Sequence, residues 1–150
     1  MEVMKKSQFE ILQIRELPST IVRDNELSKE DVAKSRLSYL VVFQHQEGNE
    51  AVAVHISLRY QTEKTVLLQE GATLIAKIDK WGEMPKDDYS LKHDERIVAF
   101  VDYGLAFVGG MVFRHVAGTA LNSIVPPQIK AEDIMENVVF NTMPKQSEVK

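Results

Sequence analysis

The chain contains no cysteine among its 150 residues. Disulfide bonds, thiolate metal sites and cysteine nucleophiles are therefore excluded, and the composition fits a reducing compartment such as the cytoplasm. Basic residues are not in surplus either, because the chain has 18 Lys and Arg but 22 Asp and Glu, which gives a net charge of -4. We therefore expect no nucleic-acid partner. The length suits one domain spanning residues 1–150, with flexible ends at 1–8 and 143–150.

Long uninterrupted apolar runs are also missing. The opening MEVMKKSQFEILQIREL alternates apolar residues with Glu10, Gln13 and Arg15, which differs from a secretory signal. The longest nearly uncharged run, residues 97–113, is shorter than the roughly 20 residues that a membrane-spanning helix needs. It also contains Asp102, so we expect no membrane span.

No set of catalytic residues is evident. The four histidines do not form an HxH, HxxxH or HExxH motif, and no phosphate-binding glycine motif or GxSxG is present. Asp102 is a lone acid in an apolar segment, for which a hydrogen bond or ion pair at an interface, or an exposed edge position, is favoured over catalysis. The sequence thus predicts no enzyme, no metal and no cofactor.

Alternating apolar and polar residues predict four strands, at residues 9–22, 35–46, 51–60 and 65–78. Pro18 bends or ends pairing in the first strand, and Gly48-Asn49 predicts a hairpin turn between the second and third. Ser28 and Asp31 predict a capping box for a short helical turn in the charged connector. Together these signals predict a four-stranded antiparallel meander with one apolar and one polar face.

A helix is predicted for residues 94–120, with Asp94 as its N-cap. The alternative is a hairpin that turns at Gly109-Gly110, because Phe, Val and Tyr favour strands. A helix would be apolar nearly all round, so one face could pack on the sheet and the other on a second subunit. The predicted oligomer interface consists of Ala99, Asp102, Ala106, Gly110 and Ala117.

Two polar segments flank this helix. The connector at residues 79–94 carries the apolar residues Trp81, Met84 and Tyr89, which either pack at the edge of the core or form a lid or binding surface. After the helix come a Pro-Pro loop and a short helical pattern over residues 130–140. The overall prediction is an α+β fold with the sheet packed on the long helix.

The order of these elements resembles the SecB export-chaperone family. The first strand, FEILQIREL, resembles that family's opening strand of Phe-x-Ile-x-x-Ile type. The closest local match is GTALNSIVPPQIKAEDIMEN, residues 118–137. Its matching positions are Gly118-Thr119, Ile124, Pro126-Pro127, Ile129 and Asp133, where the family has a helix-ending Gly-Thr, an aliphatic-Pro-Pro-aliphatic segment and an Asp that opens the last helix.

This resemblance implies an ATP-independent holdase that binds unfolded polypeptides in apolar grooves between sheet and helices. It also implies a homo-oligomer, either a dimer or a dimer of dimers in which the long helices are buried. By position, the residues that would line the polypeptide groove are Phe43, Tyr60, Leu74, Trp81, Met84 and Tyr89. Grooves of aromatic and aliphatic side chains can hold many different non-native sequences.

The chain departs from the family in its first strand. Members that dock on the SecA motor use acidic side chains on the sheet surface, including the first strand, whereas this chain has Pro18 and Val22 in that strand. The fold by itself therefore does not imply SecA docking, and a link to protein export stays open. Two alternatives stay open. One is an adaptor on the same fold that binds a single partner, for example a toxin–antitoxin component, and the other is a small-ligand-binding α+β domain with a pocket near Trp81.

Overall fold

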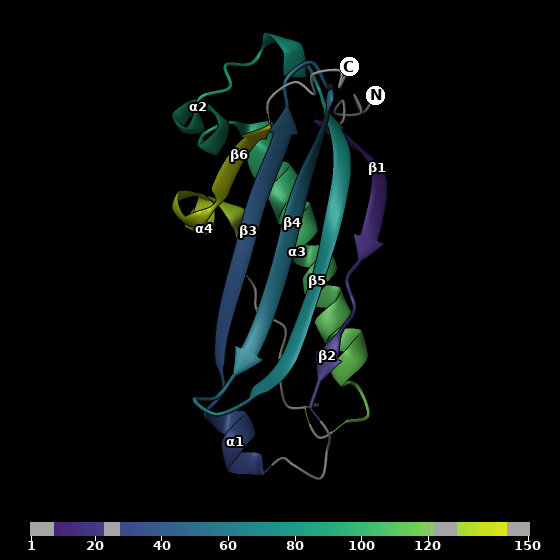
Figure 1. The fold of residues 1–150 in the computed structure, drawn as a ribbon, viewed down its shortest axis with the longest axis vertical. Coiled ribbons are helices and arrows are strands. Elements are labelled where there is room, and N and C mark those ends of the chain that lie inside the picture. The colour runs from purple at the N-terminus through teal and green to yellow at the C-terminus, as the bar shows by residue number, and fades with distance from the viewer. Residues whose placement is uncertain (1–7, 23–27, 120, 122–128, 144–150) are drawn as a thin grey trace, which may run out of the picture.

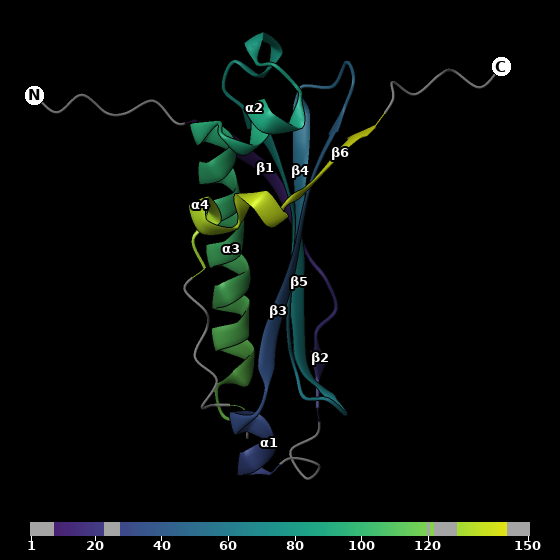
Figure 2. The same cartoon turned by 90° about the vertical axis from the view of Figure 1, so that its left-hand side faces the viewer.

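The computed structural model describes residues 8–22, 28–119, 121 and 129–143. Its main features are a six-stranded sheet with the order β1-β5-β4-β3-β6, in which β2 also pairs with β5, and a long helix, α3, along one face (Figures 1 and 2). The chain is therefore mixed α+β, as predicted, but its sheet has six strands rather than four. Most of the residues predicted to be flexible, and the Pro-Pro loop, lie outside the described part.

Three long strands form the centre of the sheet: β3 (Arg36–Gln46), β4 (Ala51–Gln61) and β5 (Val66–Ile78). They pair antiparallel in sequence order, with Phe43 opposite Val54 and Val54 opposite Leu74. Buried and partly exposed side chains alternate along β3 and β4, because successive residues of a strand point to opposite faces. The apolar face packs on α3, which confirms this part of the predicted meander.

The first strand is not next to the second. β1 (Phe9–Glu16) pairs with β5 at one edge of the sheet, and the two-residue β2 (Thr20–Ile21) continues that edge beyond Pro18. α1 (Lys29–Ala33), with its predicted capping box of Ser28 and Asp31, lies between β2 and β3 in the chain. Alternation shows that a segment is extended, but it does not show which edge it joins, so the simple meander was wrong for this strand.

The long apolar segment is one helix, α3 (Glu95–Val116), and the hairpin alternative is wrong. The carboxylate of Asp94 accepts hydrogen bonds from the backbone N–H groups of Arg96 and Ile97, so it caps the helix as predicted. By length and composition α3 could cross a membrane, but half of its most apolar window is buried within this fold. Burial against the sheet therefore accounts for the apolar residues on one face of α3.

The C-terminal part differs from the predicted helix over residues 130–140. A short helix, α4 (Ala131–Ile134), and a 3-10 turn, η3 (Met135–Asn137), lead into β6 (Val139–Met143), which pairs parallel with β3. The β-branched and aromatic residues of VVF favour an extended chain once a sheet edge is available. Between β5 and α3 the connector forms η2 (Trp81–Glu83) and α2 (Asp88–Lys92).

Candidate functional site: a half-covered sheet edge

The outer edge of β3 is only partly covered. β6 pairs with Val42–Gln46, whereas Arg36–Val41 has no strand partner on that side within the described part of the chain. Figure 1 shows β6 and α4 beside the upper half of β3, and no strand or helix of the described residues beside its lower half. Leu40, in this lower half, is 56% exposed. An edge with unpaired backbone N–H and C=O groups is a template for pairing with another extended chain.

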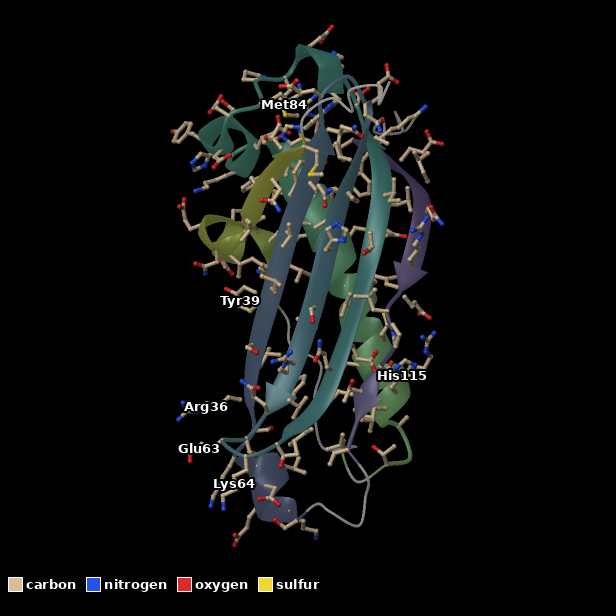
Figure 3. The ribbon with its side chains drawn as sticks, viewed as in Figure 1. Arg36, Tyr39, Glu63, Lys64, Met84 and His115 are labelled. Atoms are coloured by element: carbon tan, nitrogen blue, oxygen red, sulfur yellow. The ribbon has the colours of Figure 1, made fainter. Side chains whose placement is uncertain are left out.

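Both ends of this open edge are defined by polar side chains. Toward the upper end, two residues before Val41, Asn137 of η3 donates through Nδ2 to the hydroxyl oxygen of Tyr39 at 3.0 Å. At the lower end, an open hollow of about 740 Å³ lies between α1 and the β4–β5 turn. Arg36 and Lys64 are labelled there in Figure 3. The hollow is lined by Asp31, Lys34, Arg36, Gln61, Thr62, Glu63 and Lys64, a mixed set in which the cations outnumber the acids by one.

The residues predicted to line a polypeptide groove do not form one exposed surface. Phe43, Tyr60, Leu74, Trp81 and Met84 are buried, and only Tyr89, at 73% exposure, reaches solvent. The rings of Phe43 and Trp81 lie 6.0 Å apart in the core. Lys86 covers Trp81 from outside, with Nζ 4.2 Å from the ring centre, and donates to the carbonyl oxygens of Trp81 and Met84. In this chain Trp81, packed between Phe43 and Lys86, thus closes the end of the core.

A hollow of about 470 Å³ lies beside Trp81, where the ligand-binding alternative places a closed apolar cavity. It is open to solvent, and charged side chains alternate with apolar ones around it. The lining residues are Phe9, Glu10, Glu50, Lys77, Ile78, Asp79, Lys80, Trp81 and Gly82. Such a mixed, open lining favours solvent over an apolar small molecule.

The predicted interface residues lie on the face of α3 that points away from the sheet. Asp102, Ala106, Gly110 and Ala117 are exposed, and Ala99 is half-buried. The same face exposes two aromatic rings, Tyr103 and Phe113. Figure 2 shows this side of α3 partly crossed by α4 and otherwise uncovered by described elements.

Asp102 has a role within the chain. Its Oδ1 accepts a hydrogen bond of 2.6 Å from the backbone N–H of Ala131, the first residue of α4. Lys130, the N-cap of α4, provides no side-chain cap, so Asp102 supplies the missing acceptor from the neighbouring helix. This bond fixes α4, and with it the start of β6, against α3.

A buried polar cluster was missed in the sequence. Glu70 of β5 has no exposed surface and faces the C-terminal end of α3. Its Oε1 lies 2.5 Å from Nδ1 of His115, and its Oε2 accepts a 2.7 Å hydrogen bond from the hydroxyl of Ser19. The Ser19 hydroxyl is also 3.2 Å from the same Nδ1. Because serine and glutamate share one ring nitrogen, the cluster lacks the relay of a catalytic triad, in which they contact opposite nitrogens.

His45 is the second buried polar residue, and it lies beneath β6. Its Nε2 is 3.0 Å from the hydroxyl oxygen of Thr142, and its ring packs against Trp81 with a centroid distance of 5.3 Å. Burial, followed by the positive charge of Lys86, lowers the pKa of His45, while Asp88 and Glu47 act weakly in the opposite direction. The folded chain therefore favours the neutral ring.

The burial of His45 beneath β6 predicts that the protein becomes less stable as the pH falls. Because the pKa of His45 is lower in the folded chain, its contribution to stability is complete above about pH 6.5, the usual value for histidine, and is lost as the pH falls further. Urea unfolding followed by Trp81 fluorescence should show a steeper decline in the free energy of unfolding between pH 7 and 5 than in a His45→Gln variant. Equal slopes for the two proteins would contradict this role.

The described residues thus form a mixed α+β protein in which part of the β3 edge has no strand partner. No family model matches the chain, and no curated protein matches it either. Among solved structures, a similar one is a SecB-like chaperone of Mycobacterium tuberculosis in complex with a ChAD peptide from the HigA1 antitoxin. The two chains are 16% identical, and the match covers 81% of this chain and 88% of that one, with a TM-score of 0.35. At this identity and TM-score the match carries no argument about the family, the function or a site of this chain.

Proposed function

We propose that this protein binds extended segments of non-native polypeptides without ATP, as a holdase of the cytoplasm. The observation that carries the proposal is the unpaired lower edge of β3, Arg36–Val41, with the exposed side chain of Leu40 beside it. A non-native chain exposes backbone groups and apolar side chains, and strand addition satisfies both at once. Backbone pairing is independent of sequence, which suits a binder of many clients.

The outer face of α3 supports a second part of the proposal, self-association. Tyr103 and Phe113 are exposed on it, and the small residues Ala106 and Gly110 would let another backbone approach closely. We propose that copies pair through this face, which would leave the β3 edges free for clients. A sedimentation experiment should then show a dimer or a dimer of dimers, and a monomer at micromolar concentration would exclude the interface.

Leu40→Lys is the variant that tests the binding edge. A lysine on an edge strand opposes pairing with a further strand, so this variant should suppress aggregation of an unfolded model protein several-fold less than the unmodified chain. Leu12→Lys is the matched control, because Leu12 lies on β1 at the opposite edge and is similarly exposed, at 46% against 56%. Equal suppression by the two variants would show that clients do not bind at β3. No suppression by the unmodified chain would exclude a holdase.

A further inference from the structure

β6 covers the half of the β3 edge that the proposed function leaves out. It has five residues and pairs parallel with β3, from Val139 opposite Val42 to Met143 opposite Gln46. Every β6 side chain except that of Phe140 is exposed, including the apolar Val139 and Met143. A short parallel edge strand with so little burial has few contacts beyond its backbone hydrogen bonds.

Besides its pairing with β3, two side chains on the inner face and one further backbone hydrogen bond hold the strand. The ring of Phe140 lies 5.7 Å from that of Phe43, and the hydroxyl of Thr142 contacts His45. The N–H of Glu47 donates to the carbonyl oxygen of Met143 at 3.1 Å. The β3 edge beneath β6 therefore accepts an aromatic ring beside Phe43 and, two residues later in the bound strand, a hydroxyl group beside His45.

We propose that β6 is a replaceable strand, occupying a second pairing site that an extended segment of another polypeptide can take over. The favoured segment carries an aromatic residue followed two positions later by Ser or Thr, as Phe140 and Thr142 do. This inference rests on the proposed function, because both concern one continuous edge. With β6 displaced, all eleven residues of β3, Arg36–Gln46, would be available to a client.

The position of β6 within the chain supports replacement. The segment before β6 is held by hydrogen bonds from Ala131 to Asp102 and from Asn137 to Tyr39. These bonds involve α4 and η3 rather than β6. These elements can remain docked while β6 leaves, since the core residues Ala131, Ile134 and Met135 are all in that preceding segment. Opening of β6 thus uncovers two rings, Phe43 and His45, rather than the core as a whole.

A reversible cross-link tests the inference. Gln44 and Asn141 face each other across β3 and β6, and the chain has no native cysteine, so Gln44→Cys with Asn141→Cys would give a single disulfide. The probe is a labelled peptide with the sequence ENVVFNTMPK. The oxidised variant, in which the open state is removed, should bind this peptide at least about tenfold more weakly than the same protein after reduction. Equal binding by the two forms would overturn the inference.

Amide hydrogen exchange on the unmodified chain alone gives a readout that needs no client. The β6 amides should exchange much faster than those of β4, which is paired on both sides. Protection of β6 equal to that of β4 would overturn the inference. If the peptide displaces β6 but an unfolded client protein does not bind at Arg36–Val41, the proposed function fails and the replaceable strand stands.

Discussion

Replacing His115 by alanine should lower the free energy of unfolding by roughly 2 kcal/mol, because it removes a hydrogen-bond partner from a fully buried carboxyl group. Glu70 has no exposed surface, and after the substitution the Ser19 hydroxyl would be its one remaining side-chain hydrogen-bond partner among the described residues. The cluster joins β5, the β1–β2 segment and the end of α3, so its loss affects the packing of all three. Urea denaturation at neutral pH would measure the change.

Arg114→Ala is the matched control for His115→Ala, because Arg114 is the adjacent residue of α3. Arg114 pairs with Glu16 at 2.8 Å, but both side chains are largely exposed, and an exposed ion pair contributes less than about 1 kcal/mol. Adding Glu70→Leu to His115→Ala should recover much of the lost stability, since it removes the buried carboxyl group that has lost its hydrogen-bond partner. A loss for His115→Ala no larger than that for Arg114→Ala would show that Glu70 is not held by this partner.

Gly104→Leu should destabilise the chain by roughly 3 kcal/mol through overpacking between helix and sheet. A Cβ atom at Gly104 would overlap the Cδ1 atom of Ile56 and lie 3.5 Å from side-chain atoms of Leu74 and Val54. Ile56 can move its terminal methyl for an alanine, but a leucine would force α3 away from β4 and β5. Thermal unfolding monitored by circular dichroism would report the loss.

Gly109→Ala is the control for this substitution. Apart from its chain neighbours and the nearby backbone of α3, no heavy atom of the described residues lies within 4 Å of a Cβ atom built at Gly109, and alanine favours a helix over glycine by roughly 1 kcal/mol. The two variants should therefore change stability in opposite directions. Destabilisation by Gly109→Ala, or tolerance of Gly104→Leu, would contradict the packing described for α3.

Local patterns in the sequence predicted the local structure of this chain. The alternation in β3, β4 and β5 and the capping residue Asp94 each depend on neighbouring residues only, and each was confirmed. The positions of β1 and β6 depend on which sheet edge is free, which no local pattern specifies. For β6, the run Val138-Val139-Phe140 carried a strand signal that the helical pattern before it obscured.

The burial of polar residues could have been predicted in part. Glu70 lies in phase with Leu68 and Ala72 on the inner face of β5, so alternation alone places an acid on the apolar face. Its partner His115 is 45 residues away and Ser19 is 51 residues away, and only the tertiary fold brings them together. The predicted groove residues show the opposite case. Phe43, Leu74 and Trp81 have the residue types of a binding groove, but this chain uses them in its own core.

Amide hydrogen exchange in the presence of an unfolded client tests the central claim most directly. The account predicts that a bound client slows exchange at Arg36–Val41 of β3, because its backbone pairs with those residues, while β1 at the opposite edge is unchanged. A client that binds without added protection at Arg36–Val41, or with protection at β1 instead, would contradict the account.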